Sequence, residues 1–375
     1  MNEKEFDSLF EKAYEEKLPV FENHINIAVV GKVSAGKSSL LNAILGYDRL
    51  NAIAKVCAHS GVTTKITSYK LDTKVLIIDC PGLDDVRKEN SDETTNFLES
   101  IDLGLFVVTG SADVTQKDNY EELKKHSNKV IVILNKIDEW DDLEESAYEA
   151  VRQQWQSILG ANIVFGTCTK GYDPKTRQGA PMDIRGIEEV KNEIFAFLEK
   201  EGKAILLARH LKDKKKFAVG IIGSALLAVA VEAFIPGSAA YITATQATSI
   251  TALHYLYTGK TLSKTNSFSL IGTFASESIG TTLFLWSKSL LPPTGIVDIV
   301  AAGVAMVVTF AMLAAVKWVL ENNYSLEQID KLTEAFVHFK VAGDDLKKTS
   351  LDDLKDKESV INLIARLLST TWKPN

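Results

Sequence analysis

The sequence predicts an α/β domain with a mainly parallel sheet, joined to an all-helical domain. In the first half, short apolar runs rich in β-branched residues, such as 25–30 and 130–134, have the length and composition of buried parallel strands. In the second half, the apolar runs are longer and rich in Gly and Ala, as at 217–231 and 299–316, which suits helices. A chain of 375 residues has room for two domains that each bury their own core.

A complete G-x-x-x-x-G-K-S pattern covers residues 31–38, directly after the first strand and before a predicted helix at 39–46. Small residues let backbone N–H groups wrap phosphates, and the helix N-terminus adds a partial positive charge. We expect Lys37 to reach the β- and γ-phosphates and the Ser38 hydroxyl to bind Mg²⁺. A glycine-rich turn that binds nothing is the alternative, but it does not require eight ordered positions with both flanks correct. The remaining phosphate-binding positions are Gly31, Ser34, Ala35, Gly36 and Ser39.

A D-x-P-G pattern follows the apolar run at 75–78. Its Asp79 can hold Mg²⁺ through water at the end of a strand, and Gly82 can offer its N–H to a γ-phosphate. Alone, this pattern is also an ordinary strand-to-turn sequence, so its weight comes from its order after the phosphate loop.

An N-K-x-D pattern, made of Asn135, Lys136 and Asp138, follows the run at 130–134. The Asp138 carboxylate can accept hydrogen bonds from both the ring N–H and the exocyclic amine of guanine, whereas adenine lacks donors in that arrangement. The three motifs occur in order, each closing a predicted strand. They therefore predict an enzyme that binds GTP or GDP with Mg²⁺ and hydrolyses GTP.

With these motifs, residues 22–202 resemble a translation-factor-type (TRAFAC) GTPase of the Ras-like fold. The resemblance implies a switch I threonine that closes over Mg²⁺ and the γ-phosphate. The G-V-T-T-K segment at 61–65 is similar to that element. Thr64 is preferred for this metal-binding and catalytic role because a basic residue follows it. Thr63 is the second choice, and a polar loop entering a strand at 66–71 is the alternative reading.

The resemblance also implies a short S-A-x turn at the guanine edge. Here a predicted strand at 163–165 leads into 166–170, where Thr167 and Cys168 stand in place of Ser-Ala. Backbone N–H groups make these contacts in the family, so this weak match keeps Thr167 and Cys168 as candidate nucleotide-binding residues.

Two positions depart from the Ras-like pattern. Leu83 stands where Ras-like enzymes carry the glutamine that orients the attacking water, so catalytic help must come from elsewhere. The S-A-G-K-S-S loop at 34–39 resembles that of dynamins and bacterial dynamin-like proteins. That resemblance implies that Ser34, together with Lys37, acts in catalysis by positioning water and a monovalent cation when two G domains pair, hence a homodimer. The alternative is that Ser34 is simply small and polar.

The C-terminal half resembles, more loosely, the helical hydrophobic domain of immunity-related and bacterial dynamin-like GTPases, through its I-P-G-S-A-A turn at 235–240. The predicted division is an amphipathic N-terminal helix at 1–21 that packs on the helical domain, the G domain at 22–202, and the helical domain at 203–375.

The apolar runs admit two environments. The run 299–316 has 18 residues without a charge and is just short of a bilayer span. Glu232 and Glu277 interrupt other apolar runs, which favours a soluble helical core over membrane insertion. The lysines of 212–216 suit anionic headgroups, or are a solvated helix end.

The composition of the chain limits the classes of partner and the cell compartment to be expected. The net charge of −7 argues against nucleic acid as a partner. The three cysteines lack zinc-like or disulfide-like spacing, and the charged N-terminus does not resemble a signal peptide. We expect a cytoplasmic protein whose partner beyond the nucleotide is a membrane surface or another protein.

Overall fold

The structure, a computed structural model, describes residues 2–54, 67–80, 100–172, 179–276, 296–348 and 357–369. Its contacts form two compact units: Val20–Asp213, and Met1–Pro19 together with Lys214–Asn375. The first unit is α/β and the second is helical, so the predicted fold class is confirmed.

The division between the units falls after Asp213 rather than after residue 202. The reason is that the segment after 202 bonds to the α/β unit. Lys203 Nζ donates to Asp102 Oδ1 at 2.5 Å, and the Lys212 N–H donates to the Leu45 carbonyl at 2.9 Å.

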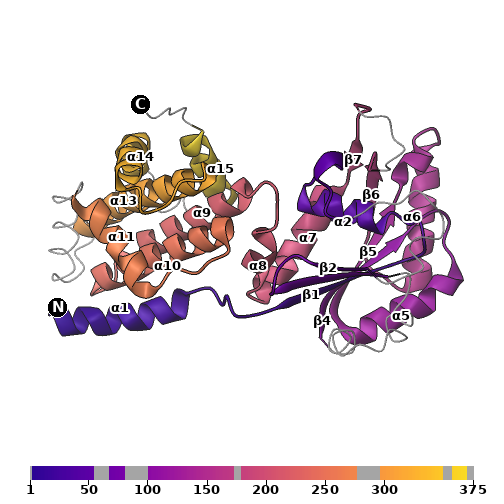
Figure 1. The fold of residues 1–375 in the computed structure, drawn as a ribbon, viewed down its shortest axis with the longest axis horizontal. Helices are drawn as coiled ribbons and strands as arrows, with labels where there is room; N and C mark the ends of the chain where they lie inside the picture. The colour runs from indigo at the N-terminus through magenta and orange to yellow at the C-terminus, as the bar shows by residue number, and fades with distance from the viewer. Residues whose placement is uncertain are drawn as a thin grey trace. The chain divides into compact units, whose positions relative to one another are not determined.

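The α/β unit contains a seven-stranded sheet in the order β2-β3-β1-β4-β5-β6-β7 among the described residues (Figure 1). The inner pairs are parallel, whereas β2 and β7 pair antiparallel with β3 and β6 at the two edges. The strands are β1 (Ile25–Val30), β2 (Thr67–Lys70), β3 (Val75–Cys80), β4 (Ile101–Val108), β5 (Ser127–Asn135), β6 (Val164–Lys170) and β7 (Asp183–Arg185).

Helices cover both faces of this sheet, with α5 and α6 on one face and α2 and α7 on the other (Figure 1). The apolar strands predict this arrangement, because a strand that is apolar on both sides must be covered on both sides. The helices are α2 (Lys37–Leu45), α5 (Lys117–His126), α6 (Glu145–Leu159), α7 (Ile187–Lys200) and α8 (Ala204–Ala208), with short 3-10 turns η1 (Arg49–Asn51), η3 (Val114–Gln116) and η4 (Ile137–Trp140).

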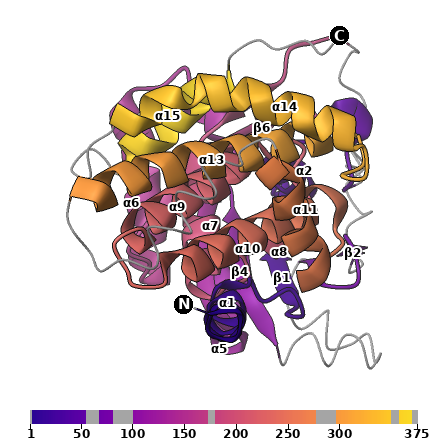
Figure 2. The same ribbon diagram turned by 90° about the vertical axis from the view of Figure 1, so that its left-hand side faces the viewer.

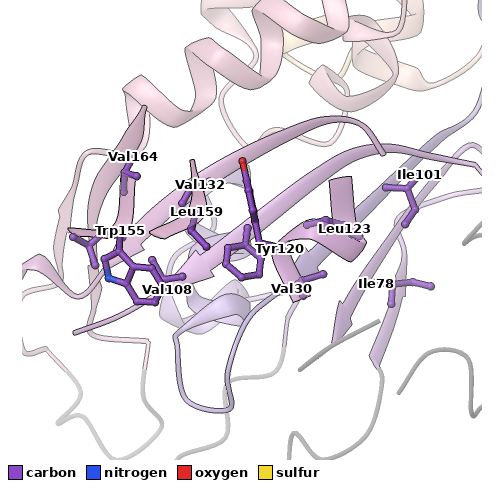
Figure 3. Close-up of a cluster of buried hydrophobic side chains, with 13 residues drawn as sticks. Val30, Ile78, Ile101, Val108, Tyr120, Leu123, Val132, Trp155, Leu159 and Val164 are labelled. Carbon is purple, nitrogen blue, oxygen red and sulfur yellow. The ribbon is translucent and has the colours of Figure 1, made fainter. Parts of the chain in front are cut away.

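The core between the sheet and helices α5 and α6 is built from large side chains (Figure 3). Tyr120 lies edge-on to Phe106 at 5.4 Å between ring centroids, and Trp155 donates its indole N–H to the Gly110 carbonyl at 2.9 Å. Because β1, β3, β4, β5 and β6 run parallel, the loops that follow them all leave at one edge of the sheet, where ligands of open α/β sheets bind.

The helical unit is arranged around α13, which contacts α9, α10 and α14 (Figure 2). Its elements are α1 (Glu3–Lys17), α9 (Lys215–Glu232), α10 (Ser238–Thr258), α11 (Lys264–Ser276), α13 (Ile296–Glu321), α14 (Ile329–Ala342), η5 (Asp344–Lys348) and α15 (Lys357–Leu368).

Helix α1 packs on α10 through aromatic side chains set against small ones. Phe6, Phe10 and Tyr14 are buried on an alanine face of α10 that includes Ala240 and Ala244. Alanine lets the two backbones approach closely while the aromatic rings supply most of the buried apolar area.

Among the described residues, one helix segment, Val300–Glu321, is long and apolar enough to cross a membrane, with a mean hydropathy of 2.1. In this structure 89% of its apolar window is buried inside the unit. A core helix has the same composition, so the segment does not decide between the two environments. Glu277 lies outside the described residues.

Candidate functional site

The phosphate-loop motif lies between β1 and α2, as the sequence predicts. Gly36 has a φ of +85°, and a Cβ there would lie 2.3 Å from the Asn135 amide nitrogen. A Cβ at Gly31 would lie 2.1 Å from the Val107 carbonyl oxygen. Both positions therefore require glycine, because the loop passes directly against β4 and β5.

Lys37 is buried at the centre of this loop. Its Nζ donates to the carbonyls of Gly31 at 2.9 Å and Lys32 at 3.2 Å, and lies 3.6 Å from Asp79 Oδ1. A buried ammonium encircled by loop carbonyls and facing a carboxylate is well placed to meet phosphate oxygens. Ala35 and Ser39 are buried beside it, whereas Ser34 is exposed.

Asp79 and Ser38, which the sequence predicts to hold Mg²⁺, are in contact with each other. The Ser38 hydroxyl donates to Asp79 Oδ2 at 2.8 Å, and Oδ1 of this almost fully buried carboxylate has no hydrogen-bond partner among the described residues. Burial raises the pKa of Asp79, and the Lys37 charge and the Ser38 hydrogen bond oppose that rise. A buried carboxylate oxygen that lacks a hydrogen-bond partner, next to a hydroxyl, fits a hard cation such as Mg²⁺.

The described residues hold no group of three or more His, Cys, Asp or Glu side chains that could bind a metal without help. This agrees with the way Mg²⁺ is usually held beside nucleotides, by one or two protein ligands together with phosphate oxygens and water.

Asn135 is buried, and its side chain forms hydrogen bonds with other residues of the protein. Its Nδ2 donates to the Ala35 carbonyl at 2.9 Å, and its Oδ1 accepts from the hydroxyls of Thr167 at 3.1 Å and Thr169 at 3.2 Å. The side chain therefore connects β5 to the phosphate loop and to β6. Thr167, predicted as a nucleotide contact, bonds to Asn135.

Asp138 lies in η4, which Lys136 precedes with a φ of +65°. Its Oδ1 accepts from the Cys168 thiol at 3.4 Å, and its Oδ2 lies 3.1 Å from Lys170 Nζ. Burial raises the pKa of Cys168 to about 11, so this thiol is a neutral donor, and the Asp138 carboxylate raises the pKa of Lys170.

The last four residues of β6 thus contact either Asn135 or Asp138. Thr167 and Thr169 contact Asn135, whereas Cys168 and Lys170 contact Asp138. This is the alternation of a strand, whose successive side chains point to opposite faces. The sequence predicted a turn at 166–170, but β7 pairs with β6 through 168–170 and extends the strand. The contacts of Thr169 and Lys170 were missed for that reason.

The other sequence-predicted positions, Thr63, Thr64, Gly82 and Leu83, lie outside the described residues.

Comparisons with known proteins agree with this site. Residues 26–136 match the family model of a 50S ribosome-binding GTPase. GTPase Der of Nitratiruptor sp. is 31% identical over 159 residues, 40% of this chain and 34% of Der. The tRNA modification GTPase MnmE of Aquifex aeolicus is 28% identical over 205 residues, 51% of this chain and 39% of MnmE.

The chain thus spans little more than a third of the length of these two relatives. Among solved structures, the G domain of the T. maritima FeoB iron transporter is 19% identical, with a TM-score of 0.28, over 47% of this chain and 99% of that one.

The order of the motifs, the buried Lys37 and Asp79, and the match at 26–136 agree with one another. Over residues 26–136 the chain is therefore similar to P-loop GTPases of the TRAFAC type, enzymes that bind and hydrolyse GTP.

Proposed function

We propose that this protein is a GTP-dependent switch in which the nucleotide bound to the α/β unit controls the helical unit. One observation carries the proposal. The chain passes between the units at two crossings, after Pro19 and after Asp213. Close to each crossing, within the α/β unit, a residue contacts the β2–β3 turn at 71–74: Phe21 at the first crossing and Arg209 at the second.

The first crossing is fastened through Lys74. Its Nζ donates to the carbonyl of Phe21, a buried residue just after the crossing, at 2.5 Å. Its own carbonyl accepts from the Ile25 N–H at 2.7 Å, where β1 begins. A movement of this turn would therefore act on the chain that enters β1.

The second crossing is fastened through Asp72. Its Oδ2 lies 2.9 Å from Arg209 Nη1 and 3.1 Å from His210 Nε2, and its Oδ1 accepts from the backbone N–H groups of Lys74 and Val75. Burial raises the pKa of Asp72. These backbone hydrogen bonds and the charges of His210 and Arg209 lower it by more, so the pKa lies below its ordinary value.

The β2–β3 turn is well placed to sense the nucleotide. Strand β2 follows the segment that carries Thr64. Strand β3 carries Asp79 one residue before its end at Cys80, and the segment that carries Gly82 comes next in the sequence. If the γ-phosphate draws these segments in, β2 and β3 must follow, and the turn transmits the shift to both crossings.

Limited digestion with trypsin tests this function, because Lys212 and the lysines of 214–216 offer cleavage sites at the second crossing. We expect different cleavage rates with GDP and with a non-hydrolysable GTP analogue. Asp72→Asn should remove that difference, whereas Asp141→Asn, which breaks an exposed pair with Arg185, should retain it. Equal cleavage of the wild type in both states, with both nucleotides bound, would refute the switch.

We also propose that catalysis is assisted by pairing of two α/β units through Ser34. Ser34 is exposed and has a φ of +66°, a conformation that costs energy for a residue other than glycine. Such strain is often retained where a side chain is used by something outside its own loop. With Leu83 unable to orient water, the isolated protein should hydrolyse GTP at a slow rate of ~10⁻⁴–10⁻² per second.

The test compares turnover per enzyme across protein concentrations. We expect the wild-type rate to rise with concentration and with a suitable monovalent cation. Ser34→Gly removes both the hydroxyl and the strain, whereas Ser34→Ala removes only the hydroxyl, and both should lose the rise. Fast turnover at low concentration in either variant would count against pairing through Ser34.

Two outputs remain for the helical unit: contact with an anionic membrane, or recruitment of a protein partner. For the helical unit we expect a packed resting state that needs no detergent, in which most of Val300–Glu321 is buried. Flotation with anionic liposomes separates the two outputs. Binding that needs the GTP analogue and weakens at high salt supports the membrane, and absence of binding supports a soluble switch whose turnover only resets it.

A further inference from the structure

We propose that Thr169 is a positioning residue for nucleotide binding: through Asn135 it holds the base-selecting segment and the phosphate loop in one fixed arrangement. The proposal rests on GTP binding by the α/β unit. Its basis is the pair of hydroxyl groups, from Thr167 and Thr169, that donate to the same oxygen of Asn135.

The orientation of the Asn135 amide is determined by its surroundings. Its Nδ2 faces the Ala35 carbonyl at 2.9 Å, so its Oδ1 must face the two hydroxyls. An amide oxygen accepts two hydrogen bonds, and both are used here. Asn135 and Thr167 are fully buried, and Thr169 is 7% exposed, so water cannot easily replace a lost donor.

The two threonines differ in how the sheet holds them. Thr167 is paired with Asn135 in the β5–β6 ladder, so the backbone keeps it in place. Thr169 lies beyond the paired end of β5 and is paired with Ile184 of β7. The Thr169 hydroxyl therefore adds a connection that the ladder does not supply. It joins β6 to the Asn135 side chain, which in turn bonds to the phosphate loop.

The loop has little room to adjust if Asn135 moves. Ala35 lies between Ser34 and Gly36, and a single added carbon at Gly36 would already approach Asn135 Nδ2 to 2.3 Å. A rotation of the amide would thus displace the backbone N–H groups that precede Lys37. The expected consequence is weaker binding of the whole nucleotide, with a loss of about 5- to 10-fold, typical of one buried hydrogen bond.

Equilibrium binding and dissociation of fluorescent GDP test the proposal on the full chain. Thr169→Val keeps the shape but removes the hydroxyl, and it should raise the dissociation constant by about 5- to 10-fold. Thr169→Ser keeps the hydroxyl and should bind nearly as the wild type does. Thr251→Val is the matched control, because Thr251 is a buried threonine of the helical unit whose hydroxyl donates to the Ala247 carbonyl.

A double-mutant cycle then separates positioning from general loosening. In an Asn135→Ala background, Thr169→Val should add no further loss, because the residue acts only through that amide. The same loss in both backgrounds, or wild-type binding by Thr169→Val, would overturn the proposal. Absence of GDP binding by the wild type itself would instead overturn the nucleotide site on which the proposal rests.

Discussion

Removing the charge of Lys17 should loosen the helical unit from its N-terminal helix. Lys17 Nζ, at the end of α1, donates to Glu232 Oε1 and, at 2.7 Å, to the hydroxyl oxygen of Thr245. That hydroxyl in turn lies 2.8 Å from the same carboxylate, which is 6% exposed. Lys17→Met keeps the aliphatic stem but leaves a buried carboxylate without its cation.

The size of the effect follows from burial. Loss of one partner of a buried ion pair costs about 3–5 kcal/mol, since the remaining charge cannot recover its hydration. The Lys17 side chain is 28% exposed, so water reaches this end of the pair and the lower value of about 3 kcal/mol is appropriate. At about 1.4 kcal/mol per factor of ten, this corresponds to opening of α1 about 100 times more often.

Hydrogen–deuterium exchange of the amides of α1 and α9 measures that opening. Lys264→Met is the matched control. Lys264 of α11 pairs with Glu11 of α1, the helix that carries Lys17, but both side chains of this pair are substantially exposed. This variant should change exchange very little. Lys17→Met combined with Glu232→Met should restore much of the protection, since a matched apolar pair replaces the ion pair. Equal effects of the two single lysine variants, or no restoration in the double variant, would refute the reasoning.

Three further predictions concern the nucleotide site. Asp138→Asn should shift preference from guanine to xanthine nucleotides, because an amide donor then meets a carbonyl; competition between GDP, XDP and ATP measures it, and equal binding of ATP and GTP by the wild type would contradict the assignment. Burial raises the pKa of Asp79 above 3.8, so without nucleotide the folded protein should lose stability as pH rises above that value. Asp79→Asn should remove this decline while weakening Mg²⁺-dependent binding, and equal pH slopes in thermal unfolding would contradict it. Burial raises the pKa of Cys168 to about 11, so its peptide should be alkylated at pH 8 far more slowly than a free thiol, as mass spectrometry can check.

The sequence was sufficient to predict the features that depend on neighbouring residues. The strand at 25–30 was predicted with the bounds that β1 has, because a short apolar run is a local property of the sequence. The phosphate loop was equally predictable, since its glycines, its lysine and its flanking strand and helix are contiguous. Each of the three motifs closes a predicted strand, and the parallel pairing of these strands in the structure brings the motifs to one edge of the sheet.

Only the tertiary structure decided which side chains meet. Glu232 looked like a mere interruption of an apolar run, but it pairs with Lys17 from the far end of the chain. The segment after 202 looked like the start of the helical domain, but Lys203 bonds it to the α/β unit. Asn135 belonged to a base-recognition pattern, yet its contacts run to the phosphate loop and β6. The periodicity of a sequence determines which face of an element is buried, whereas the partner on that face is chosen by packing between elements distant in the chain.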